Sequence, residues 1–241
     1  MKLRYLIKTF FIMLMCMLAI QNKTYAMNTG FTTREAPLEK AENFRKAVDL
    51  KVVNEIDQNS EIICFDINED GLVAIGLDGN FDRKEVGIYS SEGVFLYGYS
   101  FNSSGTYGLE WDKENIVLSF RRGDIAGVFN KAGECLEVRY IIYNEENTSY
   151  WEEIYNKDEI KYGEDRFILE NSPSPFRQYI VLKKISGQTQ DEKVIYNATL
   201  LPFLRDFVIL FIALIAWICV VVGLPIYYKK HYRYNKKKVK K

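Results

Sequence analysis

The side chains best suited to catalysis are few, and their positions exclude several classes of enzyme. The only histidine is His231, beyond the longest apolar run of the chain. Histidine-activated nucleophiles and histidine-ligated zinc both require an imidazole in the folded domain. No glycine-rich loop follows a strand and opens a helix, so the sequence offers no phosphate cradle. We therefore predict a non-enzymatic protein with no catalytic residue, no cofactor, no cofactor-binding residue and no metal ligand.

A segment that opens like a calcium loop starts at Asp66. It reads Asp66-Ile67-Asn68-Glu69-Asp70-Gly71, with oxygen side chains at the first, third and fifth positions and glycine at the sixth. The ninth and twelfth positions are Ala74 and Leu77, where a calcium loop carries further ligands and a bidentate glutamate. We therefore favour a hairpin turn over a calcium site.

Carboxylates alone leave one catalytic alternative open. A pair of them is sufficient for glycoside hydrolysis, and the chain has 32 acidic residues, so a membrane-tethered hydrolase stays an alternative. The spacing singles out no pair. For Glu145-Glu146 and Glu152-Glu153 we favour solvated surface.

Two cysteines, Cys64 and Cys135, lie between the apolar ends of the chain. A disulfide between them would close a long loop and stabilise the fold by roughly 4 kcal/mol in the chain-entropy model. The strand pattern described below places them on distant strands, which disfavours the bond. Cys16 and Cys219 lie in the terminal apolar runs, where cysteine acts as a small apolar residue.

The central segment is also rich in large aromatic residues. They could form a platform for a glycan or a peptide, because such rings give contact area at low entropic cost. Packing between sheets is the interpretation we favour. The residues are Trp111, Trp151, Tyr97, Tyr99, Tyr107, Tyr140, Tyr143, Tyr150 and Tyr155.

Charge is distributed very unevenly along the 241 residues. The totals balance at 32 basic and 32 acidic residues, but all of the acidic ones lie within 27–206, where 20 basic residues leave a net charge of −12. Nucleic-acid binding requires a positive surface, so an acidic central region argues against nucleic acid as a partner.

The N-terminal 26 residues have the layout of a secretory signal peptide. A basic start precedes an apolar run over Thr9–Ile20, and the segment ends Thr24-Tyr25-Ala26. Twelve helical residues rise about 18 Å, which is too short for a bilayer core of roughly 30 Å. We predict cleavage after Ala26; an uncleaved anchor is the alternative.

Residues 207–228 form an uncharged apolar run that is long enough to cross a bilayer. The segment 229–241 after it carries eight basic residues and no acidic one. The positive side of a span faces the cytoplasm, so we predict a single-pass cell-membrane protein with its N-terminus outside and its C-terminus cytoplasmic. The apolar helix and the basic tail would both contact membrane lipid.

Between the ends, short apolar runs alternate with turn residues, which predicts mostly β-structure. The only helix we predict is Ala36–Val48, with Pro37 near its start. The predicted strands are Ile62–Asp66, Leu72–Ile75, Val86–Tyr89, Val94–Tyr99, Ile116–Phe120, Ile125–Phe129, Cys135–Ile142, Phe167–Leu169 and Tyr179–Ile185.

An internal repeat relates these strands. Val86–Leu96 matches Ala126–Leu136 at an offset of 40, and Phe65-Asp66 corresponds to Trp111-Asp112. Each unit then has four antiparallel strands, and a third, degraded unit covers Glu159–Asn197. Residues 60–197 weakly resemble the blade repeats of bacterial β-propeller proteins, whose inner hairpin often carries an Asp-x-Asn-x-x-Gly turn. The resemblance implies a partial β-propeller; an open β-meander or sandwich is the alternative.

We therefore expect five regions: a signal peptide (1–26), a lead-in with a short helix (27–59), an extracytoplasmic β-repeat domain (60–200), a transmembrane helix (207–228) and a basic cytoplasmic tail (229–241). The predicted function is binding of a protein partner or ligand outside the membrane, or self-association. The alternative is an accessory subunit of a membrane transporter or sensor complex that contacts it through the transmembrane helix.

Overall fold

The computed structural model describes residues 27–79, 82–171, 179–198 and 201–223. The predicted signal peptide and basic tail lie outside these residues. The structure is mostly β, with antiparallel pairing throughout its two sheets. The elements are β1 (Thr33–Glu35), α2 (Leu38–Val48), β2 (Lys51–Val53), β3 (Glu61–Ile67), β4 (Val73–Asp78), β5 (Arg83–Tyr89), β6 (Phe95–Asn102), β7 (Tyr107–Asp112), β8 (Asn115–Phe120), β9 (Ile125–Phe129), β10 (Cys135–Ile141), α3 (Glu145–Asn156), β11 (Glu159–Tyr162), β12 (Asp165–Asn171), β13 (Tyr179–Ile185), β14 (Glu192–Asn197), α4 (Leu201–Ile218) and η1 (Cys219–Gly223).

Three consecutive four-stranded meanders make up most of the two sheets. The first meander is β3–β6, the second is β7–β10 and the third is β11–β14, and within each one every strand pairs with the next in sequence. The predicted four strands per unit and all nine predicted strands are thus confirmed. The described strands do not close into a propeller or a barrel. Instead, β13 pairs with β3, which joins the first and third meanders in one sheet.

One turn chemistry recurs in three of the hairpins. In each, a residue with an oxygen-bearing side chain opens the turn and accepts hydrogen bonds from the N–H groups two and four positions later; these residues are Asn68, Ser90 and Asn130. A glycine three positions after each of them has a φ of 72° to 82°. That left-handed conformation carries little steric penalty only for glycine, so the local sequence specifies the turn.

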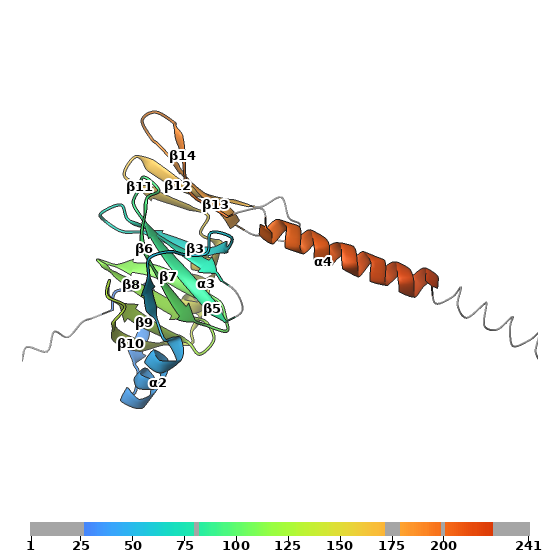
Figure 1. Ribbon diagram of the computed structural model, residues 1–241. Helices are drawn as coiled ribbons and strands as arrows, with labels where there is room; N and C mark the ends of the chain where they lie inside the picture. Colours follow the sequence, from blue (N-terminus) through green and yellow to red (C-terminus); the bar gives the residue numbers. More distant parts are fainter. Residues whose placement is uncertain (1–26, 80–81, 172–178, 199–200, 224–241) are drawn as a thin grey trace, which may run out of the picture.

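The first meander lies between the other two, as Figure 1 shows, and it is buried on both faces. In β4, Val73, Ile75 and Leu77 pack toward the third meander, while Ala74 packs toward the second. A strand covered on both faces requires a continuous apolar run, and the β4 sequence supplies one.

The segment before the first meander contributes to both sheets. β1 pairs with β10 and β2 pairs with β6, so each extends the outer edge of a meander. The predicted helix is confirmed by α2, whose Phe44 packs against Phe120 and Phe129. The repeated glycine of β5 and β9 has a packing role: Gly127 lies under Phe44, and Gly87 lies under Ile56.

The prediction that 36–48 is the only helix in this region was wrong, because α3 forms over Glu145–Asn156. Asn144 caps it by accepting a hydrogen bond from the Asn147 N–H at 2.7 Å. Asn147, Trp151 and Ile154 are buried on one face of the helix. This i, i+4, i+7 spacing after an asparagine cap was the missed sequence signal. The helix covers the second meander, where Gly108 lies against Trp151 and Ile154.

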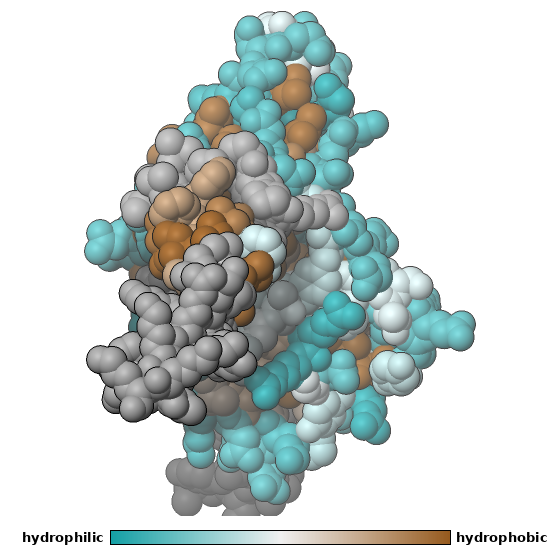
Figure 2. All heavy atoms as spheres, turned by 90° about the vertical axis from the view of Figure 1, so that its right-hand side faces the viewer, coloured by the Kyte–Doolittle hydropathy of each residue, from teal (hydrophilic) through white to brown (hydrophobic). Residues whose placement is uncertain are grey.

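After the third meander, α4 extends away from the β-structure (Figure 1). Its described side chains, with those of η1, are exposed from Phe207 to Val221. Figure 2 shows apolar side chains of this region standing out from a mostly hydrophilic surface. No helix among the described residues combines the length and the apolarity needed to cross a membrane. The predicted span over 207–228 runs past Gly223, beyond the described part of α4 and η1.

Candidate functional site

A groove lies between the first two meanders, at the end where their turns meet. It has a volume of about 760 Å³. The β3–β4, β7–β8 and β9–β10 turns contribute to its wall, together with the start of β6. We call it the turn-end groove; its lining residues are Asn68, Asp70, Leu72, Leu96, Tyr97, Glu114, Asn115, Asn130, Lys131 and Ala132.

The polar groups of this groove are held by the turns themselves. The Asn68 and Asn130 side chains are engaged in their own turns, which fixes the loops that carry Asp70 and Lys131. The carboxylates of Asp70 and Glu114 lie on exposed residues at the groove. The groove thus carries two carboxylates and one ammonium group, that of Lys131, and its excess of negative charge suits a polar ligand that carries positive charge.

One aromatic ring, that of Tyr97, forms part of the same wall. The Tyr97 and Tyr99 rings pack edge to face at 5.6 Å, and the Tyr99 hydroxyl donates to the Asn130 carbonyl at 3.1 Å. Burial raises the pKa of the Tyr97 phenol above its ordinary value, so the ring stays neutral at physiological pH. Lys131 Nζ lies 5.1 Å from the Tyr97 ring centroid, within cation–π range. This ring face therefore already receives a cation in the structure.

The Asp66–Gly71 segment forms a hairpin turn, not a converging set of ligands. Asp66 Oδ2 accepts the Trp111 N–H at 2.8 Å, and its Oδ1 lies 3.9 Å from Lys157 Nζ. Asn68 accepts two backbone N–H groups within the turn. The side-chain oxygens of Asp66 and Asn68 thus have separate protein partners. No group of three or more histidine, cysteine, aspartate or glutamate side chains in the described residues could hold a metal ion.

A buried acidic site lies on the outer face of the second meander, under α3 and the N-terminal segment. Glu110 is 7% exposed, and its carboxylate accepts hydrogen bonds from Tyr150, Thr29 and the Gly30 N–H at 2.5, 2.5 and 3.2 Å. Burial is the largest cause that raises the pKa of Asp66, and Glu110 adds to it. We predicted no role for Glu110. The alternation of side chains along β7 points Glu110 away from the first meander. The groups that contact Glu110 on that face come from α3 and from the N-terminal segment, which the β7 sequence does not reveal.

The two central cysteines are free thiols. Cys64 is buried beside Tyr107, and Cys135 starts β10, the last strand of the second meander. Burial raises the pKa of both thiols, which lowers their reactivity. The predicted separation of the two cysteines on different strands is confirmed.

Most of the aromatic residues pack in the interior and do not form a platform. Tyr99, Tyr107 and Trp151 are 5% exposed or less, while Tyr143 is 89% exposed. The Trp151 and Tyr155 rings stack within α3 at a centroid distance of 5.4 Å. Of the predicted platform residues, only Tyr97 lines the turn-end groove.

The two acidic pairs of the sequence lie on exposed positions of α3, which confirms the surface interpretation for Glu145, Glu146, Glu152 and Glu153. Glu152 lies 3.8 Å from Arg121, as an exposed ion pair.

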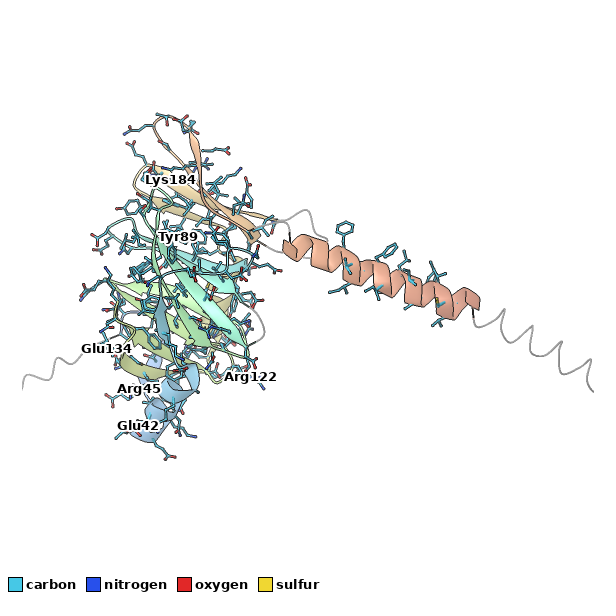
Figure 3. The ribbon with its side chains drawn as sticks, in the orientation of Figure 1. Glu42, Arg45, Tyr89, Arg122, Glu134 and Lys184 are labelled. Atoms are coloured by element: carbon cyan, nitrogen blue, oxygen red, sulfur yellow. The ribbon has the colours of Figure 1, made fainter. Side chains whose placement is uncertain are left out.

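Besides the apolar core and the β13–β3 pairing, a charged contact links the third meander to the first. Lys184 Nζ lies 3.2 Å from Glu92 Oε1, in the β5–β6 turn, and 3.0 Å from Asp165 Oδ2. Figure 3 shows Lys184 in the third meander and Glu42 and Arg45 on α2, at opposite ends of the β-structure.

Comparison with models of known protein families and with curated proteins finds no match for this chain. The function is therefore argued from the site itself.

Proposed function

We propose that the chain is a non-enzymatic, single-pass membrane-anchored surface protein whose acidic extracytoplasmic β-domain binds a protein partner. The turn-end groove is the observation that carries this proposal. Three turns hold polar groups around it, with the Asp70 and Glu114 carboxylates exposed at the groove. A net charge of −12 over 27–206 adds long-range attraction for a basic partner.

The recognised feature is a basic, extended segment of the partner. Asp70 and Glu114 would pair with its lysine or arginine side chains. The Tyr97 ring is the second element, because it already lies under the Lys131 ammonium. A cationic side chain of the ligand would compete with Lys131 for this ring.

Membrane anchorage is supported by sequence and by exposure together. Residues 207–228 carry no charge, and 229–241 carry eight basic residues and no acidic one. The described side chains from Val208 to Val221 are exposed, which leaves a large apolar surface on the described part of the helix. Lipid would cover it, with the basic tail on the cytoplasmic side.

The three meanders are proposed to be blade-like repeats of an open, partial propeller. Support comes from the strand order common to all three and from the turn with a left-handed glycine that recurs in the first and second meanders. Face-to-face packing of the meanders agrees with that architecture.

A binding assay on the full chain in detergent tests the groove. The probes are a fluorescent hexapeptide of alternating glycine and arginine and its glutamate counterpart, followed by anisotropy. The double variant Asp70→Asn/Glu114→Gln should bind the arginine peptide about tenfold more weakly, from two ion pairs of about 0.7 kcal/mol each. The exposed control Glu42→Gln on α2 should bind it as the wild type does.

Equal affinity of the wild type and the double variant would refute the groove as the binding site. Equal affinity for both peptides would refute charge recognition. Protease treatment of sealed vesicles tests the topology: the β-domain should be digested from outside while the 229–241 tail is protected, and the opposite result would refute the orientation.

The alternative, an accessory subunit of a membrane transporter or sensor complex, is favoured by the exposed apolar side chains of α4 alone. Exchange of 207–228 for an unrelated apolar span separates the two functions. A binding protein should keep its peptide affinity after the exchange, whereas a subunit should lose its association with other membrane proteins.

A further inference from the structure

The segment Met27–Thr32 lies on the outer face of the second meander and is bound there mainly through its backbone. Its N–H groups donate to side chains of β7, β10 and α3. The pairs are Met27 N to Glu137 Oε2 at 2.7 Å, Asn28 N to Asp112 Oδ2 at 2.9 Å, Gly30 N to Glu110 Oε1 at 3.2 Å and Thr32 N to Asn147 Oδ1 at 2.9 Å. Three of the four acceptors are carboxylates, so the first residues of this segment lie in an acidic site.

Met27, which makes the first of these contacts, is the residue directly after the predicted cleavage site. Thr24-Tyr25-Ala26 has small residues where a signal peptidase requires them. Hydrolysis of the Ala26–Met27 peptide bond consumes one water, leaves a carboxylate on Ala26 and leaves an amino group on Met27. The nitrogen that becomes this amino group is the atom that already donates to Glu137.

We propose that Glu137 is the docking site of the mature N-terminus: signal-peptide removal creates an α-ammonium at Met27 that pairs with the Glu137 carboxylate and holds segment 27–32 on the second meander. This inference rests on the extracytoplasmic location proposed above. The precursor has only a neutral amide at this atom, with a single N–H. The processed chain has a charged group with three donors, and charge-assisted hydrogen bonds are about twice as strong as neutral ones.

The surroundings of Glu137 suit this role. Its side chain is 17% exposed, so solvent screens the pair less than it screens a surface ion pair. Arg139 Nε contacts the other carboxylate oxygen at 2.7 Å and orients the group. The Met27 side chain packs against the core that α3 and the second meander share. Processing would therefore strengthen the attachment of the segment to the outer face of the second meander.

The test measures how fast the N-terminal amine reacts. The full chain is produced in a secreting host and extracted in detergent, and its intact mass is expected to show a chain that starts at Met27. It is then treated at pH 7 with an amine-acylating ester, and the Met27 peptide is followed by mass spectrometry. We expect acylation about tenfold slower in the wild type than in Glu137→Gln, because a nearby carboxylate keeps the amine protonated. Glu42→Gln should react as the wild type does.

A second variant keeps Glu137 and moves the ammonium away. Insertion of Gly-Ser between Ala26 and Met27 displaces the amine by about 7 Å, so acylation should again be about tenfold faster than in the wild type. Equal rates in the wild type and in either variant would overturn the docking. A mass that places the cleavage elsewhere, or shows none, would overturn the processing step. Neither outcome alters the vesicle experiment, so failure here is distinguishable from failure of the proposed topology.

Discussion

Substitution of Gly127 by alanine should detach α2 from the second meander. A Cβ at this position would lie 2.7 Å from Phe44 Cε1 and 3.0 Å from Phe129 Cε2. Phe44 is 8% exposed and packs edge to face on Phe120 at 5.3 Å, so it has little room to move within the core. The added methyl group must therefore displace the phenylalanine that anchors the helix.

Two opposing effects determine the magnitude. Overpacking of a core costs about 1–3 kcal/mol, while replacement of glycine within a strand returns about 0.5–1 kcal/mol. We expect Gly127→Ala to lower the free energy of unfolding by about 1–2 kcal/mol. Phe44→Ala alone should cost about 3–5 kcal/mol. If Phe44 is the obstacle, Gly127→Ala should cost at least about 1 kcal/mol less in the Phe44→Ala background than in the wild type.

The assay is denaturant unfolding at 25 °C, followed by tryptophan fluorescence, for the wild type, both single variants and the double variant. Gly87→Ala is the matched control, because this glycine holds the equivalent strand position but its Cβ would meet Ile56 at 2.7 Å. Gly87→Ala should combine additively with Phe44→Ala. If the stability losses of Gly127→Ala and Phe44→Ala add to within about 0.5 kcal/mol in the double variant, the packing argument is refuted.

Three further outcomes are expected. Asn147 is 2% exposed, and its side chain makes hydrogen bonds of 2.6–2.9 Å to the backbone of Thr32 and Ile142. Asn147→Ala should therefore lower the free energy of unfolding by about 2–4 kcal/mol and accelerate hydrogen exchange at the Thr32 amide. Unchanged exchange at Thr32 would contradict this. Burial raises the pKa of Asp66, so its charged form is disfavoured in the fold and stability increases as the pH falls through the folded-state pKa. Asp66→Asn should then be more stable than the wild type at pH 7, with a difference that shrinks toward acidic pH, and thermal unfolding at several pH values checks the sign. Gly133 has a φ of 82°, so Gly133→Ala should lower stability by about 1 kcal/mol, whereas Ala132→Gly in the same turn should change it far less.

Local stereochemistry is the part of this fold that the sequence determines. The turns at Asn68, Ser90 and Asn130 each contain the oxygen acceptor and the left-handed glycine that they use. Short apolar runs between such turns specify strands, so nine of the meander strands and the repeat of the first two meanders could be predicted, whereas β7, β11 and β14 were not among the predicted strands. For the same reason α2 could be placed from its apolar face and from Pro37.

Pairing between distant segments was decided only in the tertiary structure. β1 is three residues long, and its partner lies more than 100 positions away, with Thr33 opposite Ile141. The acidic site around Glu110 forms because α3 and the N-terminal segment converge on one face of β7. We made no prediction for Glu110 from the sequence, and packing buries it to 7% exposure. Backbone preference and turn geometry act over a few residues, whereas burial depends on which faces meet, and that is a property of the whole chain.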